Sequence, residues 1–242
     1  MEVPFSADIG FLKIEGDRVP NASPAGILEY NWKNHSIRTV EYPIKISVKL
    51  KSLYCHSQNE YCSDEPYLIV SAFAGNKTWI IKKCRLGDVD DGENHSICSD
   101  TKDIFGDASI IRGEKPNEVT LMPGEYAGFH ILVMEEDNGI EFDDLVNELF
   151  DDINQAVDML PPLPGKYVHK FLLNLFESIA EGILDVLYSI WEAIDPDDYV
   201  DEQGIVYEYD NITLGERTNS IDFEGDDAYY TIYFEESFEI VK

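Results

Sequence analysis

The sequence predicts a mainly β fold of the α+β class: an antiparallel β-sandwich with a helical hairpin inserted before its C-terminal strands. Short apolar segments separated by turn-forming residues recur between residues 44 and 134 and again after residue 204, which is typical of a sandwich. Over residues 141–194 the apolar residues instead recur every three or four positions, as they do in helices. Because strands near both ends of the chain need partners, we expect one domain over residues 1–242.

The first clear strand is residues 44–50, IKISVKL, in which apolar and polar residues alternate, so one face is expected to be buried. Residues 67–73 and 78–81 flank the sequence AGNK and predict a hairpin whose turn contains Gly75 and Asn76. A polar loop is predicted for residues 87–107, and further strands are predicted for residues 118–122, 128–134, 204–209 and 229–240.

The last predicted strand has two different faces. Tyr230, Ile232 and Phe234 lie on one face, and the other face carries Tyr229, Thr231, Tyr233 and Glu235. We expect this strand to complete the sheet after the helical segment.

Residues 141–194 predict two amphipathic helices, separated by the helix breakers Pro161, Pro162, Pro164 and Gly165. Their apolar stripe is expected to be buried against itself or against the sheet, and it includes Leu145, Leu149, Phe171, Leu175, Ile179, Leu187 and Trp191. The alternative is that this stripe docks on a membrane or a partner. Charged residues interrupt the apolar segment too often for a transmembrane span.

The chain is strongly acidic, with 48 Asp and Glu against 18 Lys and Arg and a formal net charge of −30. A field of that sign repels nucleic-acid phosphates, so direct nucleic-acid binding is not expected. A hydrophobic content of 44% still predicts a folded chain. The acidic residues occur in clusters, which are the kind of ligand set that hard cations need.

Four cysteines lie in the first half of the chain and predict two disulfides. Of the three possible connectivities we favour the local one, Cys55 with Cys62 and Cys84 with Cys98, because each bond would close a loop between predicted strands. Five glycosylation sequons begin at Asn21, Asn34, Asn76, Asn94 and Asn211. Disulfides and sequons together predict a secreted or otherwise extracytoplasmic protein, although the first residues contain no signal peptide.

Two segments place carboxylates at the ends of predicted strands. One reads Ser63-Asp64-Glu65-Pro66-Tyr67-Leu68, and the other has the spacing Glu135-x-Asp137-x5-Asp143. Here the chain resembles the C2 domain family, calcium-binding β-sandwiches with an S-D-P-Y-V type loop and a later D-x-D-x5-D motif. This sequence departs from the pattern in the inserted Glu65, in Glu135 at the first position of the later motif, and in the helical segment that follows.

The resemblance implies a calcium site whose ligands are Asp64, Glu135, Asp137 and Asp143, with Asp144 as a further candidate. Flexible loops with several carboxylates can supply the six to eight oxygens that calcium takes. The alternative interpretation is that Asp64 caps a turn while Asp143 and Asp144 cap a helix.

No nucleophile elbow, recognisable Cys–His pair or H-E-x-x-H motif is present, and His130, which lies among apolar residues, is read as a core histidine. We therefore expect a noncatalytic, calcium-responsive binding module that recognises an anionic membrane surface or a protein partner through bound calcium. The alternatives are a secreted toxin or effector with a membrane-engaging helical hairpin, and a hydrolase whose carboxylates are not recognisable from sequence.

Overall fold

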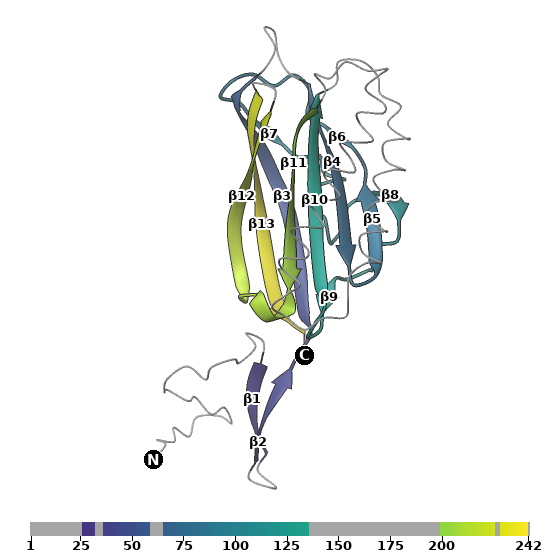
Figure 1. Cartoon of the computed structure of the whole chain (residues 1–242), viewed down its shortest axis with the longest axis vertical. Helices are drawn as coiled ribbons and strands as arrows, with labels where there is room; N and C mark the ends of the chain where they lie inside the picture. The colour runs from purple at the N-terminus through teal and green to yellow at the C-terminus, as the bar shows by residue number, and fades with distance from the viewer. Residues whose placement is uncertain (1–25, 32–35, 59–64, 136–198, 226–227, 242) are drawn as a thin grey trace.

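The computed structural model describes residues 26–31, 36–58, 65–135, 199–225 and 228–241, in which two antiparallel sheets pack face to face (Figure 1). The prediction of an antiparallel β-sandwich is thereby confirmed in its general form. The predicted helical hairpin, residues 141–194, lies outside the described residues and stays a prediction.

Sheet 1 has the strand order β11-β10-β4-β5-β8, and β6 also pairs with β4. Its strands are β4 (Pro66–Ala74), β5 (Lys77–Ile81), β6 (Cys84–Arg85), β8 (Ile110–Gly113), β10 (Tyr126–Glu135) and β11 (Tyr199–Glu208). The predicted hairpin is confirmed, because β4 and β5 pair directly up to Ala74 and Lys77. Gly75 has a φ of 58° in the turn between them, a conformation that glycine adopts without steric cost.

Sheet 2 has the order β12-β13-β3-β7, and β9 also pairs with β3. Its strands are β3 (Ile44–Ser57), β7 (Asn94–Ser96), β9 (Thr120–Leu121), β12 (Gly215–Gly225) and β13 (Ala228–Ile240). The C-terminal strand β13 pairs with β3 along almost its whole length, from Tyr229 with Ser57 to Ile240 with Ile44. The sheet is therefore completed by the end of the chain, as expected.

A smaller sheet of two strands, β1 (Gly26–Asn31) and β2 (Ser36–Glu41), precedes the sandwich and lies below it in Figure 1. Between β11 and β12, the short 3-10 helix η3 (Tyr209–Asn211) carries the chain from sheet 1 to sheet 2. No helix among the residues that the structure describes is long and apolar enough to span a membrane.

The core between the sheets contains side chains from the inward faces of both. Phe129 of β10 meets Phe234 of β13 edge to face, with 5.8 Å between the ring centroids. Trp79 of β5 is fully buried, and its indole Nε1 donates a hydrogen bond of 3.3 Å to the carbonyl oxygen of Ile104. Buried aromatic side chains of this kind stabilise the fold mainly through the apolar area that they remove from water.

Residues 87–107 are only partly the polar loop that was predicted. Val89, Ile104 and Phe105 are buried, and β7 adds a short strand beside β3. Single apolar residues scattered in a polar segment give no periodic signal, so their burial is decided by the sheets around them.

Strand β10 and strand β11 are direct antiparallel neighbours, with Tyr126 opposite Glu208 and Met134 opposite Tyr199. Residues 136–198 are therefore an insertion between two adjacent strands of one sheet. Connections between such strands usually need only two to five residues.

Candidate binding surface

The predicted calcium ligands are only partly within the described residues. Glu135, the last residue of β10, is 3% exposed, and its Oε1 accepts a hydrogen bond of 3.2 Å from the hydroxyl of Tyr230 on the opposite sheet. Asp64, Asp137, Asp143 and Asp144 lie outside the described residues. Within the described ranges, no group of three or more His, Cys, Asp or Glu side chains is placed to hold a metal ion.

The register places the start of β4 beside the end of β10. Pro66, the first residue of β4, is opposite Glu135, the last residue of β10. These two paired residues are the described neighbours of the two motifs in the sequence.

A second buried carboxylate, Glu236 of β13, lies on the inward face and is 2% exposed. Its Oε1 accepts a hydrogen bond of 2.5 Å from the hydroxyl of Tyr207 in sheet 1. Its Oε2 accepts hydrogen bonds from Arg217 Nε and, at 2.7 Å, from Asn219 Nδ2 of β12. Burial, together with the nearby Glu236 carboxylate, raises the pKa of the Tyr207 hydroxyl well above its ordinary value.

Glu135 and Glu236 thus have related roles. Each is an inward-facing carboxylate held by a tyrosine hydroxyl from the opposite sheet, so each links the two layers of the sandwich. Removing a donor from such a buried carboxylate destabilises the fold, because the charge then lacks a hydrogen bond that water cannot replace.

The outer face of sheet 1 carries a histidine and a carboxylate in contact. His130 Nε2 lies 3.1 Å from Glu202 Oε2, and both side chains are almost fully buried, which confirms His130 as a buried residue. Ser71 lies directly opposite His130 in the β4–β10 register but is only 1% exposed.

The outer face of sheet 2, in contrast, is open to solvent and carries a cluster of rings on β3 and β13. We call Tyr54, His56, Tyr229 and Tyr233 the ring cluster. The His56 ring stacks on Tyr229 with 4.2 Å between centroids, and Tyr54 meets His56 edge to face at 4.7 Å. Tyr233 is 38% exposed. Rings that are part exposed on a sheet surface offer apolar faces and hydrogen-bonding edges to a ligand at once.

A chain of hydrogen bonds crosses this face beside the rings. The hydroxyl of Thr231 donates to Asp222 Oδ1 at 2.7 Å, and His56 Nε2 lies 2.8 Å from the same hydroxyl oxygen. Since the hydroxyl hydrogen is used in the bond to Asp222, the hydroxyl oxygen accepts a hydrogen bond from the histidine N–H. The Thr231 hydroxyl is therefore held between Asp222 of β12 and His56 of β3.

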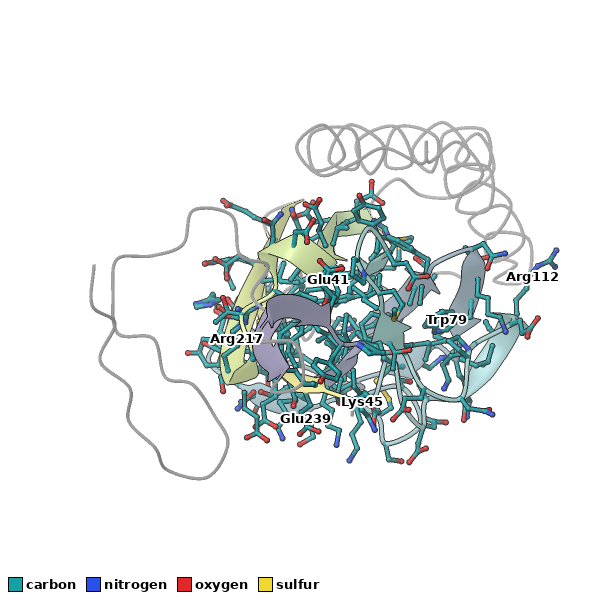
Figure 2. All side chains as sticks on the ribbon, turned by 90° about the horizontal axis from the view of Figure 1, so that it is seen from below. Glu41, Lys45, Trp79, Arg112, Arg217 and Glu239 are labelled. Carbon is teal, nitrogen blue, oxygen red and sulfur yellow. A yellow bond between two sulfur atoms is a disulfide. The ribbon has the colours of Figure 1, made fainter. Side chains whose placement is uncertain are left out.

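Below the ring cluster, lysine side chains of β3 lie on the same outer face, at positions that alternate with buried residues. Lys45 bonds Glu118 at 2.5 Å, and Lys51 bonds Glu235 of β13 at 2.9 Å. The hydrogen bond and charge of Glu118 raise the pKa of Lys45. Figure 2 shows Lys45 and Glu239 projecting together from the sandwich, as their direct pairing in the register requires.

A groove of about 440 Å³ lies on the same face of sheet 2. Its lining comes from β3, β12 and β13 and includes Lys45, Lys49, Arg217, Glu235 and Glu239. In a chain with a net charge of −30, this is a surface where positive and negative side chains alternate. Sequence reasoning placed Tyr229, Thr231 and Tyr233 on one face but did not identify the neighbouring strand that supplies Tyr54 and His56.

The disulfide between Cys84 and Cys98 is present, as predicted, with an S–S distance of 2.10 Å. Cys55 is buried in the core, and its predicted partner Cys62 lies outside the described residues, so that bond stays a prediction.

No protein-family model matches the sequence, and a search of curated proteins finds no match either. The resemblance to C2 domains therefore rests on the two loop motifs. The structure supports its more general part, an antiparallel β-sandwich.

Proposed function

We propose that this chain is a noncatalytic binding module that holds a protein partner on the outer face of β3, β13 and β12. The observation that carries the proposal is the ring cluster on a sheet face that is otherwise open and charged. Its rings are not enclosed in the core, so their exposed faces are free for contact with another molecule.

The chemistry of the face suits a protein surface. Tyrosine is enriched where proteins meet, because its large ring gives contact area at little cost in side-chain entropy and its hydroxyl still forms hydrogen bonds. The groove below adds charges of both signs, from Lys45 and Lys49 on β3 and from Glu235 and Glu239 on β13. Such charges contribute orientation and specificity more than affinity.

Calcium is the second part of the proposal. Asp64, Asp137, Asp143 and Asp144 would bind it at the end of sheet 1, with Glu135 at the edge of the site. The pairing of Pro66 with Glu135 supports this, because the two motifs adjoin these paired strand ends in the sequence. Bound cations would there cancel local negative charge and bridge to an anionic partner or membrane surface, as in the C2-like interpretation.

An extracytoplasmic location is supported by the Cys84–Cys98 disulfide, because such bonds persist mainly in oxidising compartments. Three of the five sequons lie in the described residues, and Asn76, Asn94 and Asn211 are all exposed. A glycan could therefore be carried at any of these three residues by the folded chain.

The test of the proposal uses paired baits. The wild-type chain and the double variant His56→Ala/Tyr233→Ala are immobilised side by side and exposed to extract or culture medium from the source cells. A protein retained by the wild type is then purified, and its affinity for both chains is measured. We expect the variant to bind about tenfold more weakly or worse, as truncation of central aromatic contacts usually does.

The matched control is Ile111→Ala, which removes a similarly exposed side chain from β8 on sheet 1. It should bind like the wild type. Ile111→Ala should keep the wild-type melting temperature, whereas the double variant should melt somewhat lower because it loses the His56 stack and its hydrogen bond to Thr231; binding is therefore measured well below both melting temperatures. Equal affinity of the partner for all three chains would overturn the proposed surface.

A further inference from the structure

Strand β12 forms the edge of sheet 2 and is open to solvent. Among the strands that the structure describes, β13 is its only paired neighbour, and Figure 1 shows β12 at the margin of the sandwich. The strand has 11 residues, and residues 215–220 are all exposed. A long exposed edge presents backbone N–H and C=O groups with which another strand can pair.

The backbone groups of β12 alternate between β13 and this edge. In an antiparallel pair, both groups of one residue point to the same side, and the side changes at each residue. The N–H of Glu224 points away from β13, because it donates a hydrogen bond of 3.2 Å to Asp201 Oδ2 of β11. The register with β13 continues without a shift from Gly215 to Gly225. The groups on the open side therefore belong to the even-numbered residues, which include Glu216, Thr218, Ser220 and Asp222.

Strand β11 closes one end of this edge. Asp201 accepts from the N–H of Glu224, and Gly225 lies so close to the carbonyl oxygen of Val200 that a Cβ would not fit there. The open part is therefore residues 216–222, which we call the free edge. Its length suits a partner strand of about six residues, a usual length for a strand.

The outer side chains of the free edge are acidic or neutral. Arg217 and Asn219 donate hydrogen bonds to the buried Glu236, so the odd-numbered residues point inward. Because side chains alternate between the two faces of a strand, the even-numbered ones lie on the outer face of sheet 2. This outer row has two carboxylates, two hydroxyls and no cation: Glu216, Thr218, Ser220 and Asp222.

These charges determine which strand can be added. In a symmetric antiparallel pair of two β12 strands centred on Asn219, Glu216 of each copy would lie opposite Asp222 of the other. Like charges that are directly opposite each other destabilise a strand pair, and each copy also has a net charge of −30. The acidic row therefore disfavours a second copy of this chain and favours a strand with lysine or arginine.

The inward side of the free edge offers a different contact. A hollow of about 280 Å³ lies between β11 and β12, and its lining includes Ile205, Ile212 and Asn219. The side chains of an added strand would also alternate, with one set beside the acidic row and the other set facing this hollow. A complementary strand therefore alternates basic with apolar residues.

We propose that the free edge of β12 binds an extended segment of a partner protein in which basic and apolar residues alternate, so that the segment becomes a further strand of sheet 2. Backbone hydrogen bonds along residues 216–222 hold the segment, and its basic side chains lie beside Glu216 and Asp222. The inference is independent of the ring cluster, so either surface can bind its partner if the other does not.

Amide hydrogen exchange of the full chain, followed by NMR, tests where a strand is added. The probe is a synthetic peptide of alternating lysine and valine, used at about 0.15 M salt to screen nonspecific attraction. We expect the amides of the even-numbered residues 216–222 to exchange fast in the free chain and at least about tenfold more slowly with the peptide bound. The amides of Arg217 and Asn219 should exchange slowly in both states, because they point to β13.

Two variants test the edge itself. Ser220→Pro removes one donor from the free edge and leaves the pairing with β13 intact, so it should bind the peptide about tenfold more weakly. The matched control Ser220→Ala keeps that N–H and should bind like the wild type. The double variant Glu216→Lys/Asp222→Lys keeps the backbone unchanged and should also lose affinity for the lysine peptide.

Four results would contradict the inference. The first three are no binding of the lysine peptide to the wild type, equal affinity for the wild type and Ser220→Pro, and binding without slower exchange of the free-edge amides. The fourth is slow exchange of these amides in the free chain, which would show that the edge is already paired with another segment or with a second copy.

Discussion

The carboxylate of Glu236 gives a prediction that can be worked out from the structure. It is 2% exposed and accepts hydrogen bonds from Tyr207, Arg217 and Asn219. Arg217 is its only described cationic hydrogen-bond partner, and the guanidinium also lies 4.9 Å from the Phe238 ring centroid. Arg217→Ala would leave a negative charge in the sandwich interior with two neutral donors.

The expected cost follows from the burial of the two partners. Removing one side of a buried ion pair costs about 3 to 5 kcal/mol of folding free energy, because the remaining charge is neither hydrated nor paired. The Arg217 side chain is 43% exposed, so water reaches part of the space that it leaves. We therefore expect a loss near the low end of this range, about 3 kcal/mol.

The assay is urea unfolding of four chains under identical conditions, with the free energy obtained by linear extrapolation. Arg217→Ala/Glu236→Leu should recover most of the stability lost in Arg217→Ala, since the unpaired charge is then gone. Lys77→Ala removes an exposed ion pair with Glu114 and should cost no more than about 1 kcal/mol. A loss below about 1 kcal/mol for Arg217→Ala, or no recovery in the double variant, would refute the reasoning.

Three further predictions follow from the same structure. Burial raises the pKa of Tyr207 above its ordinary value of 10.0, so the folded state keeps the hydroxyl proton at a pH where the unfolded state loses it. The free energy of unfolding of the wild type, measured relative to Tyr207→Phe by urea unfolding, should therefore fall as the pH rises from about 9 to about 11. Millimolar calcium should raise the melting temperature, and Asp137→Asn should abolish most of that rise; an unchanged wild-type melt would contradict the calcium site. Nonreducing peptide mapping should recover the Cys84–Cys98 link, and free thiols at both positions would contradict the extracytoplasmic assignment.

Several strands could be predicted because their residues carry a local signal. The alternation in residues 44–50 reports one buried face, and the Gly75-Asn76 turn reports the hairpin, since both depend only on neighbouring residues. Strand β12 carries no such signal. It lies at the edge of sheet 2 and is exposed over most of its length, so its polar sequence resembles a loop.

The candidate surface shows the same division. The alternation in the last strand placed Tyr229 and Tyr233 on one face, but nothing in the sequence indicates that Tyr54 and His56 lie beside them. That proximity comes from the pairing of β3 with β13, which are far apart in the chain. Glu236 is a further case, because it interrupts an inward row of apolar residues and its donors come from two other strands.

The sequence by itself determined the β class, the hairpin and the acidic character of the chain, because each follows from composition or from residues close together in the chain. It favoured the Cys84–Cys98 bond but left the other connectivities open, and the structure decided between them. Only the tertiary structure decided which strands pair, which sheet faces solvent and where the buried carboxylates find their donors. The continuous apolar runs of β4 and β10 show why. A run of that kind reports burial on both sides of a strand, but what lies on each side depends on segments that are distant in sequence.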